Sequence, residues 1–216
     1  MTPRQDEQAV QSAYDEVADS YADLVRSTEP EQRIELAMIE HFASLLSGDK
    51  RVLDAGCGAG RLLPVLAAME CLVEGVDLSG GMVRRAQRDH PTFATSIASI
   101  TDLPHPDESF DGYFSWYSTI HSPDDQLAHV FGEARRVLRT GGVLLVAFQT
   151  GHGVRDVSGA YRSHGHDITL ERYNRTTDDL SSVVAGAGFE EVARLERQAA
   201  GVHERDGQAV LIARAS

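Results

Sequence analysis

The chain has 216 residues, of which 42% are hydrophobic and 25% charged, a composition typical of one globular domain with a substantial core. Its formal net charge of −13 disfavours nucleic-acid backbones and anionic membrane surfaces as partners, because both are negatively charged. With two cysteines, no apolar run near the ~20 residues of a membrane span, and no signal-peptide pattern in the first ten residues, we expect no disulfide framework and a cytoplasmic location.

The first part of the chain is predicted to form two helices. Apolar residues recur at steps of three and four over residues 5–26, and again over residues 34–45 before Gly48. Buried strands then alternate with helices. The predicted strands are residues 50–55, 71–76, 93–97, 110–115 and 143–148, and the predicted helices are residues 61–69, a segment capped by Ser79, and residues 125–138. This alternation predicts a mostly parallel, doubly wound sheet.

The last third of the chain departs from this alternation. Residues 149–170 are rich in glycine and histidine and are predicted to form a loop, which precedes a helix at residues 177–187. Strands at residues 189–197 and 208–213 follow with no helix between them, so we predict that they pair antiparallel at one edge of the sheet. Residues 203–206 are interpreted as the solvated turn of this hairpin.

The strongest local pattern is the turn from Asp54 to Gly60, Asp-Ala-Gly-Cys-Gly-Ala-Gly. Glycines lack Cβ atoms, so a ligand can approach this backbone closely, at a strand end where open α/β sheets form a binding crevice. The spacing is G-x-G-x-G; the dinucleotide pattern G-x-G-x-x-G would need a third glycine at Arg61, and no phosphate loop is present. An acidic residue before the glycines suits an ammonium-bearing ligand. Asp77, ending the next strand, is placed to accept ribose hydroxyls, or alternatively to cap a helix.

Together these residues resemble the class I S-adenosylmethionine-dependent methyltransferases of the small-molecule type. The matching blocks, in chain order, are Tyr14-Asp15-x-x-Ala18-x-x-Tyr21, Asp54 to Gly60, Gly75 to Ser79 with Met82, Leu103 to Asp111, and Glu133 to Leu138 before Gly141-Gly142. The resemblance implies methyl transfer with S-adenosylmethionine as cofactor and S-adenosylhomocysteine as product. It also implies an α/β, Rossmann-like, doubly wound, seven-stranded, mostly parallel sheet with an antiparallel strand at the edge and helices on both faces.

On this interpretation residues 1–216 form a single domain. Its expected parts are N-terminal helices over the active site (1–47), a cofactor-binding core (48–148), an acceptor loop or lid (149–170), and a C-terminal helix with the antiparallel strand pair (171–216). As partners we expect a small-molecule acceptor, no nucleic acid and no membrane, with the chain acting as a monomer or homodimer.

The resemblance also assigns cofactor contacts. Asp54 and the backbone of Gly56, Cys57, Gly58 and Gly60 would hold the methionine part, Asp77 the ribose, and Leu78 and Met82 the adenine. The family usually has an Asp for the adenine amino group where this chain has Ser99, beside Ile100. Tyr14 and Tyr21 lie seven residues apart on one helical face; they would close the pocket from above or only anchor the helix.

His121, which follows the fourth strand, is the candidate catalytic base. Methyl transfer from a sulfonium depends mostly on alignment, and a base helps only where the acceptor must lose a proton. The ordinary pKa of histidine, near 6.5, leaves it partly neutral, and the family often has a His here; the alternative is a structural role before Pro123. Trp116 and Tyr117, at the same strand end, would wall the cofactor or acceptor pocket, or belong to the core.

The segment 149–170 is predicted to be a lid beside the acceptor pocket. Its His152, Arg155 and Tyr161 would contact the acceptor, and Arg155 or Arg162 would meet an anionic group. The alternatives are a solvated loop and a metal site at His164-Gly165-His166-Asp167. Because that metal site lacks a firm third ligand, we predict no metal.

The predicted function is therefore methylation of an oxygen or nitrogen of a small metabolite. A nucleic-acid or protein methyltransferase is one alternative, disfavoured by the acidic charge and the lack of a basic stripe. A non-catalytic module that binds S-adenosylmethionine is a second, which the sequence leaves open. A nicotinamide-dependent dehydrogenase is disfavoured by the glycine spacing.

Overall fold

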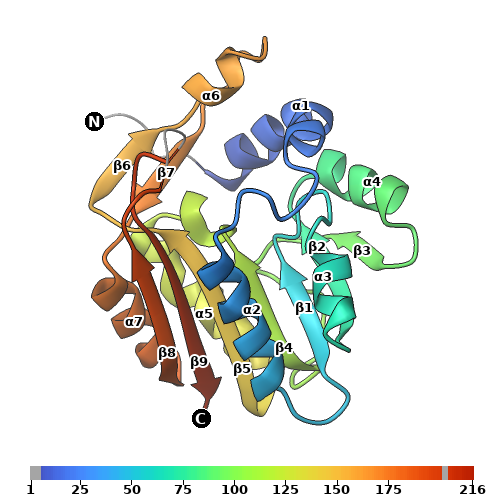
Figure 1. Cartoon of the computed structure of the whole chain (residues 1–216), viewed down its shortest axis with the longest axis vertical. Coiled ribbons are helices and arrows are strands. Elements are labelled where there is room, and N and C mark those ends of the chain that lie inside the picture. The colour runs from blue at the N-terminus through green and yellow to red at the C-terminus, as the bar shows by residue number, and fades with distance from the viewer. Residues whose placement is uncertain (1–5, 201–203) are drawn as a thin grey trace.

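The computed structural model describes residues 6–200 and 204–216 and contains a seven-stranded sheet in the order β3-β2-β1-β4-β5-β9-β8 (Figure 1). The strands are β1 (Arg51–Ala55), β2 (Leu72–Asp77), β3 (Ala94–Ile97), β4 (Phe110–Trp116), β5 (Leu138–Gln149), β8 (Phe189–Arg197) and β9 (Gln208–Ala215). The first five pair in parallel, whereas β9 is antiparallel to both β5 and β8. The predicted fold class is confirmed, with the antiparallel strand lying next to the edge strand β8.

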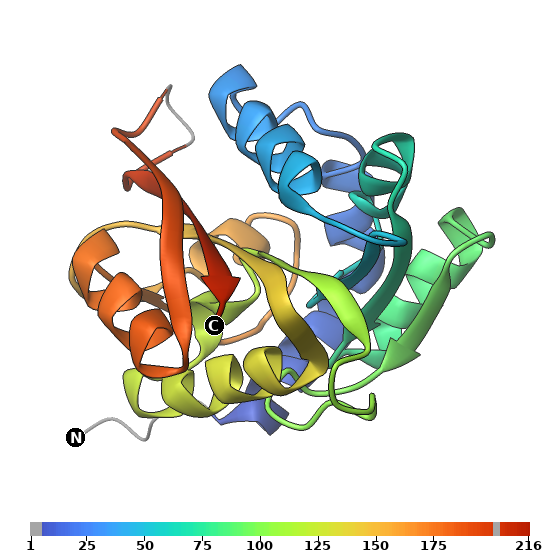
Figure 2. The ribbon, with the colours of Figure 1, turned by 90° about the horizontal axis from the view of Figure 1, so that it is seen from below.

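Helices cover both faces of this sheet (Figure 2). They are α1 (Glu7–Leu24), α2 (Arg33–Leu45), α3 (Leu63–Ala68), α4 (Gly80–Asp89), α5 (Asp124–Val137), α6 (Gly159–Arg162) and α7 (Thr177–Gly186), with a short 3₁₀ helix η1 (Thr119–His121). Neighbouring strand residues alternate between two cores: Leu144 packs with α5 and α7, whereas Leu145 packs with α2 and α3. This two-residue period is what a strand buried on both faces requires. None of the described helices is long and apolar enough to cross a membrane.

Two predictions of secondary structure are wrong, the start of one strand and the description of one segment as a loop. The chain leaves α5 at Val137 and enters β5 at Leu138, so the pair Gly141-Gly142 lies within the strand rather than before it. The segment 149–170 is not only a loop, because β6 (Gly153–Asp156) pairs antiparallel with β7 (Glu171–Asn174) as a separate two-stranded sheet. Four-residue strands next to glycines carry too short a pattern for the sequence to reveal them.

The N-terminal helix α1 is fastened over the carboxyl ends of the sheet (Figure 1). One carboxylate oxygen of Asp15 accepts hydrogen bonds from the Ser79 hydroxyl and the Gly81 amide, each at 2.7 Å. Arg85 of α4 forms ion pairs with Asp19 and Asp23 of α1. Asp15 therefore stabilises the N-terminus of α4, where a negative charge is favoured, and holds α1 above the glycine-rich turn.

Candidate functional site

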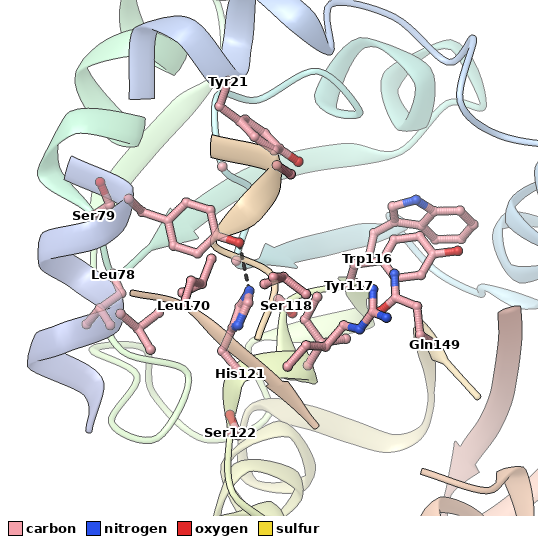
Figure 3. A pocket seen from close by; sticks show the side chains of 18 of the residues that line it. Tyr21, Leu78, Ser79, Trp116, Tyr117, Ser118, His121, Ser122, Gln149 and Leu170 are labelled. Atoms are coloured by element: carbon pink, nitrogen blue, oxygen red, sulfur yellow. Dashed lines mark hydrogen bonds between the residues drawn. The ribbon is translucent and has the colours of Figure 1, made fainter. Parts of the chain in front are cut away.

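A cavity of about 850 Å³ opens above the carboxyl ends of the parallel strands, between α1 and the β6–β7 hairpin (Figure 3). Its volume lies in the upper part of the range typical of small-molecule sites. The predicted site residues that line it are Tyr14, Tyr21, Gly56, Gly58, Asp77, Leu78, Met82, Ser99, Ile100, Trp116, Tyr117, His121, Arg155 and Tyr161. Side chains from distant parts of the sequence therefore converge on one cavity.

Four predicted residues lie outside that lining. Asp54 is 2% exposed at the end of β1, where burial raises its pKa to about 7 against the opposing positive charge of Arg61. Cys57 packs beneath the turn, so tightly that a Cβ on Gly75 would lie 2.7 Å from its sulfur. Gly60 faces other protein atoms, and His152 is exposed to solvent. Direct contact of these residues with a ligand, through the backbone in the case of Gly60, stays a prediction.

The backbone amides of the glycine-rich turn are largely used within the protein. The amides of Gly56 and Cys57 both donate to the Val76 carbonyl, at 2.8 and 2.9 Å, and the Gly60 amide donates to the Cys57 carbonyl. Gly56 has φ +85°, and a Cβ there would lie 2.2 Å from the Ser118 Cβ, so only glycine fits. A turn whose amides are occupied is a poor phosphate cradle, because phosphate sites need free N–H donors.

Asp77 is held rigidly at the tip of β2. One carboxylate oxygen accepts the Gly58 amide at 2.8 Å and the other accepts the Ser79 amide at 2.9 Å. Burial raises the pKa of Asp77, and these two hydrogen bonds oppose that shift. Each oxygen has further acceptor capacity, so the carboxylate can bind a pair of hydroxyls in the cavity without moving.

Glu7 reaches the neighbouring strand tip, which sequence reasoning did not anticipate. One carboxylate oxygen of Glu7 accepts hydrogen bonds from the Ser99 hydroxyl at 2.8 Å and from the Thr101 hydroxyl at 2.9 Å. Glu7 and Ser99 both line the cavity beside the apolar residues Leu78 and Ile100. A carboxylate therefore lies next to Ser99, the position where the family usually has an Asp, and it comes from Glu7 of α1. No local pattern could reveal a contact between residues 92 positions apart.

His121 and Tyr14 form a hydrogen-bonded pair in the cavity wall (Figure 3). The Nδ1 atom of His121 lies 2.6 Å from the Glu171 carbonyl, which can only accept, so Nδ1 carries the proton. The other ring nitrogen, Nε2, then accepts the Tyr14 hydroxyl at 2.7 Å. Burial lowers the pKa of His121 to about 4. The expected partly neutral ring is corrected here to a ring that is neutral at physiological pH.

Trp116 and Tyr117 are fixed by two buried glutamates. The Trp116 indole donates to Glu31, which also forms a two-point ion pair with Arg61. The Tyr117 hydroxyl donates to Glu35 at 3.2 Å, and Tyr117 has φ +58°, an unusual value for a bulky residue. The wall is therefore built by long-range ion pairs and local backbone strain, which the sequence did not indicate.

The predicted lid, residues 149–170, contributes some of its predicted residues to the cavity. Tyr161 and Arg155 line it, whereas Arg162 is half exposed, does not line it, and pairs with Asp156, which does. His166 forms a hydrogen bond with the Ser20 hydroxyl of α1 at 2.7 Å, which joins the segment 149–170 to the N-terminal helix. Across residues 6–200 and 204–216, no three histidine, cysteine or acidic side chains are grouped as metal ligands.

A family model and a similar protein both identify methyltransferases as relatives of this chain. A family described as a methyltransferase domain matches residues 52–142. A malonyl-[acyl-carrier protein] O-methyltransferase from Erwinia pyrifoliae is 30% identical over 166 residues, which are 77% of this chain. The chain spans 61% of that relative's length.

Two solved structures share the fold over nearly the whole chain. A 1,6-didemethyltoxoflavin-N1-methyltransferase from Burkholderia thailandensis, solved with S-adenosylhomocysteine, has a TM-score of 0.73 at 18% identity and covers 97% of this chain and 88% of its own. The [4+2]-cyclase SpnF has a TM-score of 0.73 at 20% identity and covers 99% of this chain and 98% of its own. At such identities the likeness concerns the fold alone.

Proposed function

The chain belongs to the class I S-adenosylmethionine-dependent methyltransferases, and on that premise we propose that it methylates an oxygen or nitrogen atom of a small molecule. One observation carries the proposal. The turn at Gly56–Gly60 keeps its amides for the protein, while the rigid Asp77 carboxylate faces the cavity beside it. That arrangement suits a ligand with a cationic amino acid end and a ribose, and it does not suit a pyrophosphate.

The cavity offers suitable residues for each part of S-adenosylmethionine in turn, from the amino acid end to the adenine. The turn with Gly56 and Gly58 would hold the amino acid end, and Asp77 would bind the ribose hydroxyls. Leu78, Met82 and Ile100 line the cavity beyond Asp77 and would enclose a flat base. Glu7, fixed by Ser99 and Thr101, would accept the adenine amino group with the acceptor capacity that its two hydroxyl partners leave.

When bound, the cofactor supplies a methyl group on a positively charged sulfur, which needs little further activation. The chain's own contribution is therefore alignment and exclusion of water. Tyr14, Tyr21 and Tyr161 line the cavity and would shield it from water, and burial is the main cause that raises their pKa values. The helix α1 and the lid supply these three residues.

Proton removal, where the acceptor needs it, falls to His121. Its Nε2 atom carries a lone pair that meets the Tyr14 hydroxyl, and the Glu171 carbonyl keeps the ring in that tautomer. An acceptor hydroxyl can give its proton to Nε2 by displacing Tyr14, or through the Tyr14 hydroxyl as a relay. With a pKa of about 4, His121 is a weak base, so an acidic acceptor group suits it best.

The proposal of an oxygen or nitrogen acceptor is supported by the names of two similar proteins, whereas two others are named C-methyltransferases. The Erwinia relative is named an O-methyltransferase, and the Burkholderia structure is that of an N-methyltransferase. A macromolecular substrate is less consistent with this chain, since its net charge is −13 and its cavity lies beneath α1 and the lid. A non-methyltransferase use of the fold is the second candidate, because SpnF shares the fold and is a cyclase.

Two measurements test the proposed function. Calorimetry should detect binding of S-adenosylhomocysteine and no binding of NAD at the same concentrations. Labelled methyl groups should then pass from S-adenosylmethionine to members of a small-molecule panel. Binding of NAD without S-adenosylhomocysteine would overturn the cofactor assignment. Binding of the cofactor with no transfer to any acceptor, peptide and nucleic acid included, would favour a non-catalytic or cyclase-type role.

A further inference from the structure

Two arginines lie opposite each other in the β6–β7 hairpin, where the hairpin lines the cavity. Arg155 of β6 is directly opposite Arg172 of β7 in the antiparallel register, and both line the cavity. Paired residues of antiparallel strands project to the same face, so two positive charges are brought together there. Like charges in this position destabilise a hairpin, which therefore needs a compensating partner.

One carboxylate compensates both arginines. Asp206, in the loop between β8 and β9, forms an ion pair with Arg155 at 2.9 Å through one oxygen and with Arg172 through the other. The Arg172 and Asp206 side chains are 15% and 9% exposed, whereas that of Arg155 is 40% exposed, so the cluster is buried on the Arg172 side and open to solvent at Arg155. Residues 203–206 are predicted to form a solvated turn, and this prediction is wrong for Asp206, whose side chain is largely buried in ion pairs. His203 lies outside the described residues. Figure 1 shows the described part of this loop that precedes β9 lying beside β7.

The other nearby carboxylates have different partners. Asp156 pairs with Arg162 and accepts hydrogen bonds from Ser158, whereas Glu35 and Glu204 both pair with Arg197. The cavity lining at this end also includes Arg205. Among the described residues, Arg155 and Arg172 thus share a single carboxylate, which leaves an excess of positive charge in a protein of strongly negative net charge.

We propose that Arg155 and Arg172 bind an oxyanion, a carboxylate or a phosphate, on the methyl acceptor. Guanidinium groups bind both anions through paired N–H donors, and a second anion beside Asp206 would balance the charge of the pair. The inference rests on the proposed function, since it names the acceptor class of the same cavity. The anion would anchor the acceptor between the hairpin and the β5 end, on the far side of His121 from α1.

The test uses ligand pairs that differ only in charge. Phenylacetate, phenylacetamide and phenyl phosphate are titrated into the full chain with saturating S-adenosylhomocysteine, and affinities are measured by ligand-observed NMR. Wild-type protein should bind at least one of the two anions about tenfold to a hundredfold more tightly than the amide, the range expected for charge-assisted hydrogen bonds. The two anions together show whether the site prefers a carboxylate or a phosphate.

Two variants, one that removes a positive charge and one that removes a negative charge, distinguish an anion-binding site from an ion-pair cluster with only a structural role. Arg172→Gln should remove the preference for the anion, whereas Asp206→Asn should strengthen anion binding, because it removes the competing carboxylate. Arg194→Gln is the control, since it deletes the same charge from a residue that does not line the cavity and whose partners, Asp178 and Glu191, do not line it either. Thermal unfolding of each variant verifies folding. Loss of anion affinity in both Arg172→Gln and Asp206→Asn would overturn the proposal, as would equal binding of the amide by wild-type protein.

The same titrations without cofactor keep this inference apart from the proposed function. Anion preference without any binding of S-adenosylhomocysteine would overturn the cofactor proposal and leave the arginine site standing as an anion site. Cofactor binding with no preference for either anion would contradict the arginine site alone. Conversion of neutral acceptors only, in the labelled-methyl assay, would also contradict it.

Discussion

The Tyr14 hydroxyl lies 2.7 Å from the Nε2 atom of His121, although 107 residues separate them in the sequence. The contact joins α1 to the end of η1 across the cavity, and a second hydrogen bond from His121 to the Glu171 carbonyl joins β7 to the same ring. One imidazole therefore connects the N-terminal helix, the core and the β6–β7 hairpin. Its state bears on both stability and chemistry.

The neutral His121 should make stability depend on pH. Its pKa is about 4 in the folded chain and near 6.5 when unfolded, so the unfolded state binds more protons between these values. The stabilising contribution is complete above pH 6.5, is lost as the pH falls towards 4, and amounts to about 3 kcal/mol. Urea unfolding of wild type and His121→Gln between pH 7 and pH 4 measures it.

The comparison of the two proteins is essential, because Asp54 acts in the opposite direction. Burial raises the pKa of Asp54 to about 7, so over the same range its contribution grows as the pH falls. Both proteins contain Asp54, so their difference isolates His121. Parallel pH curves for wild type and His121→Gln would show that the ring is not held neutral.

Turnover should depend on the Tyr14–His121 pair more than cofactor binding does. His121→Gln removes the proton acceptor, and we expect kcat to fall by about 10²-fold for a hydroxyl acceptor, in the range of general-base contributions. Tyr14→Phe should give a smaller loss, because Nε2 stays available. Affinity for S-adenosylhomocysteine, measured by calorimetry, should change by less than about threefold, under 1 kcal/mol. Unchanged kcat in His121→Gln would assign the ring a structural role only.

Glu7 should make ligand binding selective for the amino group of adenine. Replacing S-adenosylhomocysteine by S-inosylhomocysteine exchanges the amino donor for a carbonyl acceptor, and wild-type protein should bind the inosine analogue about tenfold or more weakly, as a lost charge-assisted hydrogen bond requires. Glu7→Ala should reduce this discrimination by weakening only the adenosine ligand. Glu16→Ala, a change of the same charge on the same helix outside the cavity, should leave it intact. Equal discrimination in Glu7→Ala and wild type would place the adenine elsewhere.

Two glycines of the turn should respond differently to alanine. Gly56→Ala brings a Cβ to 2.2 Å from the Ser118 Cβ and forces a side chain into φ +85°, so the turn must shift. Gly58→Ala has φ +55° and no atom within 4 Å of the new Cβ, so only the conformational cost of about 1–2 kcal/mol applies. Denaturant unfolding should therefore find Gly56→Ala the less stable variant by at least 1 kcal/mol, a cost typical of overpacking. The reverse order would contradict the close approach of Ser118.

Local sequence determined the central sheet. The period of apolar residues, the caps and the glycine turn are set by neighbours along the chain, and the elements from β1 to α5 lie within a few residues of their predicted positions. Most of the predicted cofactor residues line one cavity for the same reason, because the carboxyl ends of parallel strands meet at one edge of the sheet.

The sequence alone did not determine what surrounds that edge. Glu7 at Ser99, Tyr14 at His121 and Asp206 between two arginines are contacts between residues 92, 107 and tens of positions apart. A side chain's partner across such distances depends on how helices and hairpins dock, and docking follows from the packing of whole faces rather than from any local pattern. The same packing set the protonation state of His121, because burial, which lowers its pKa, exists only once the chain is folded.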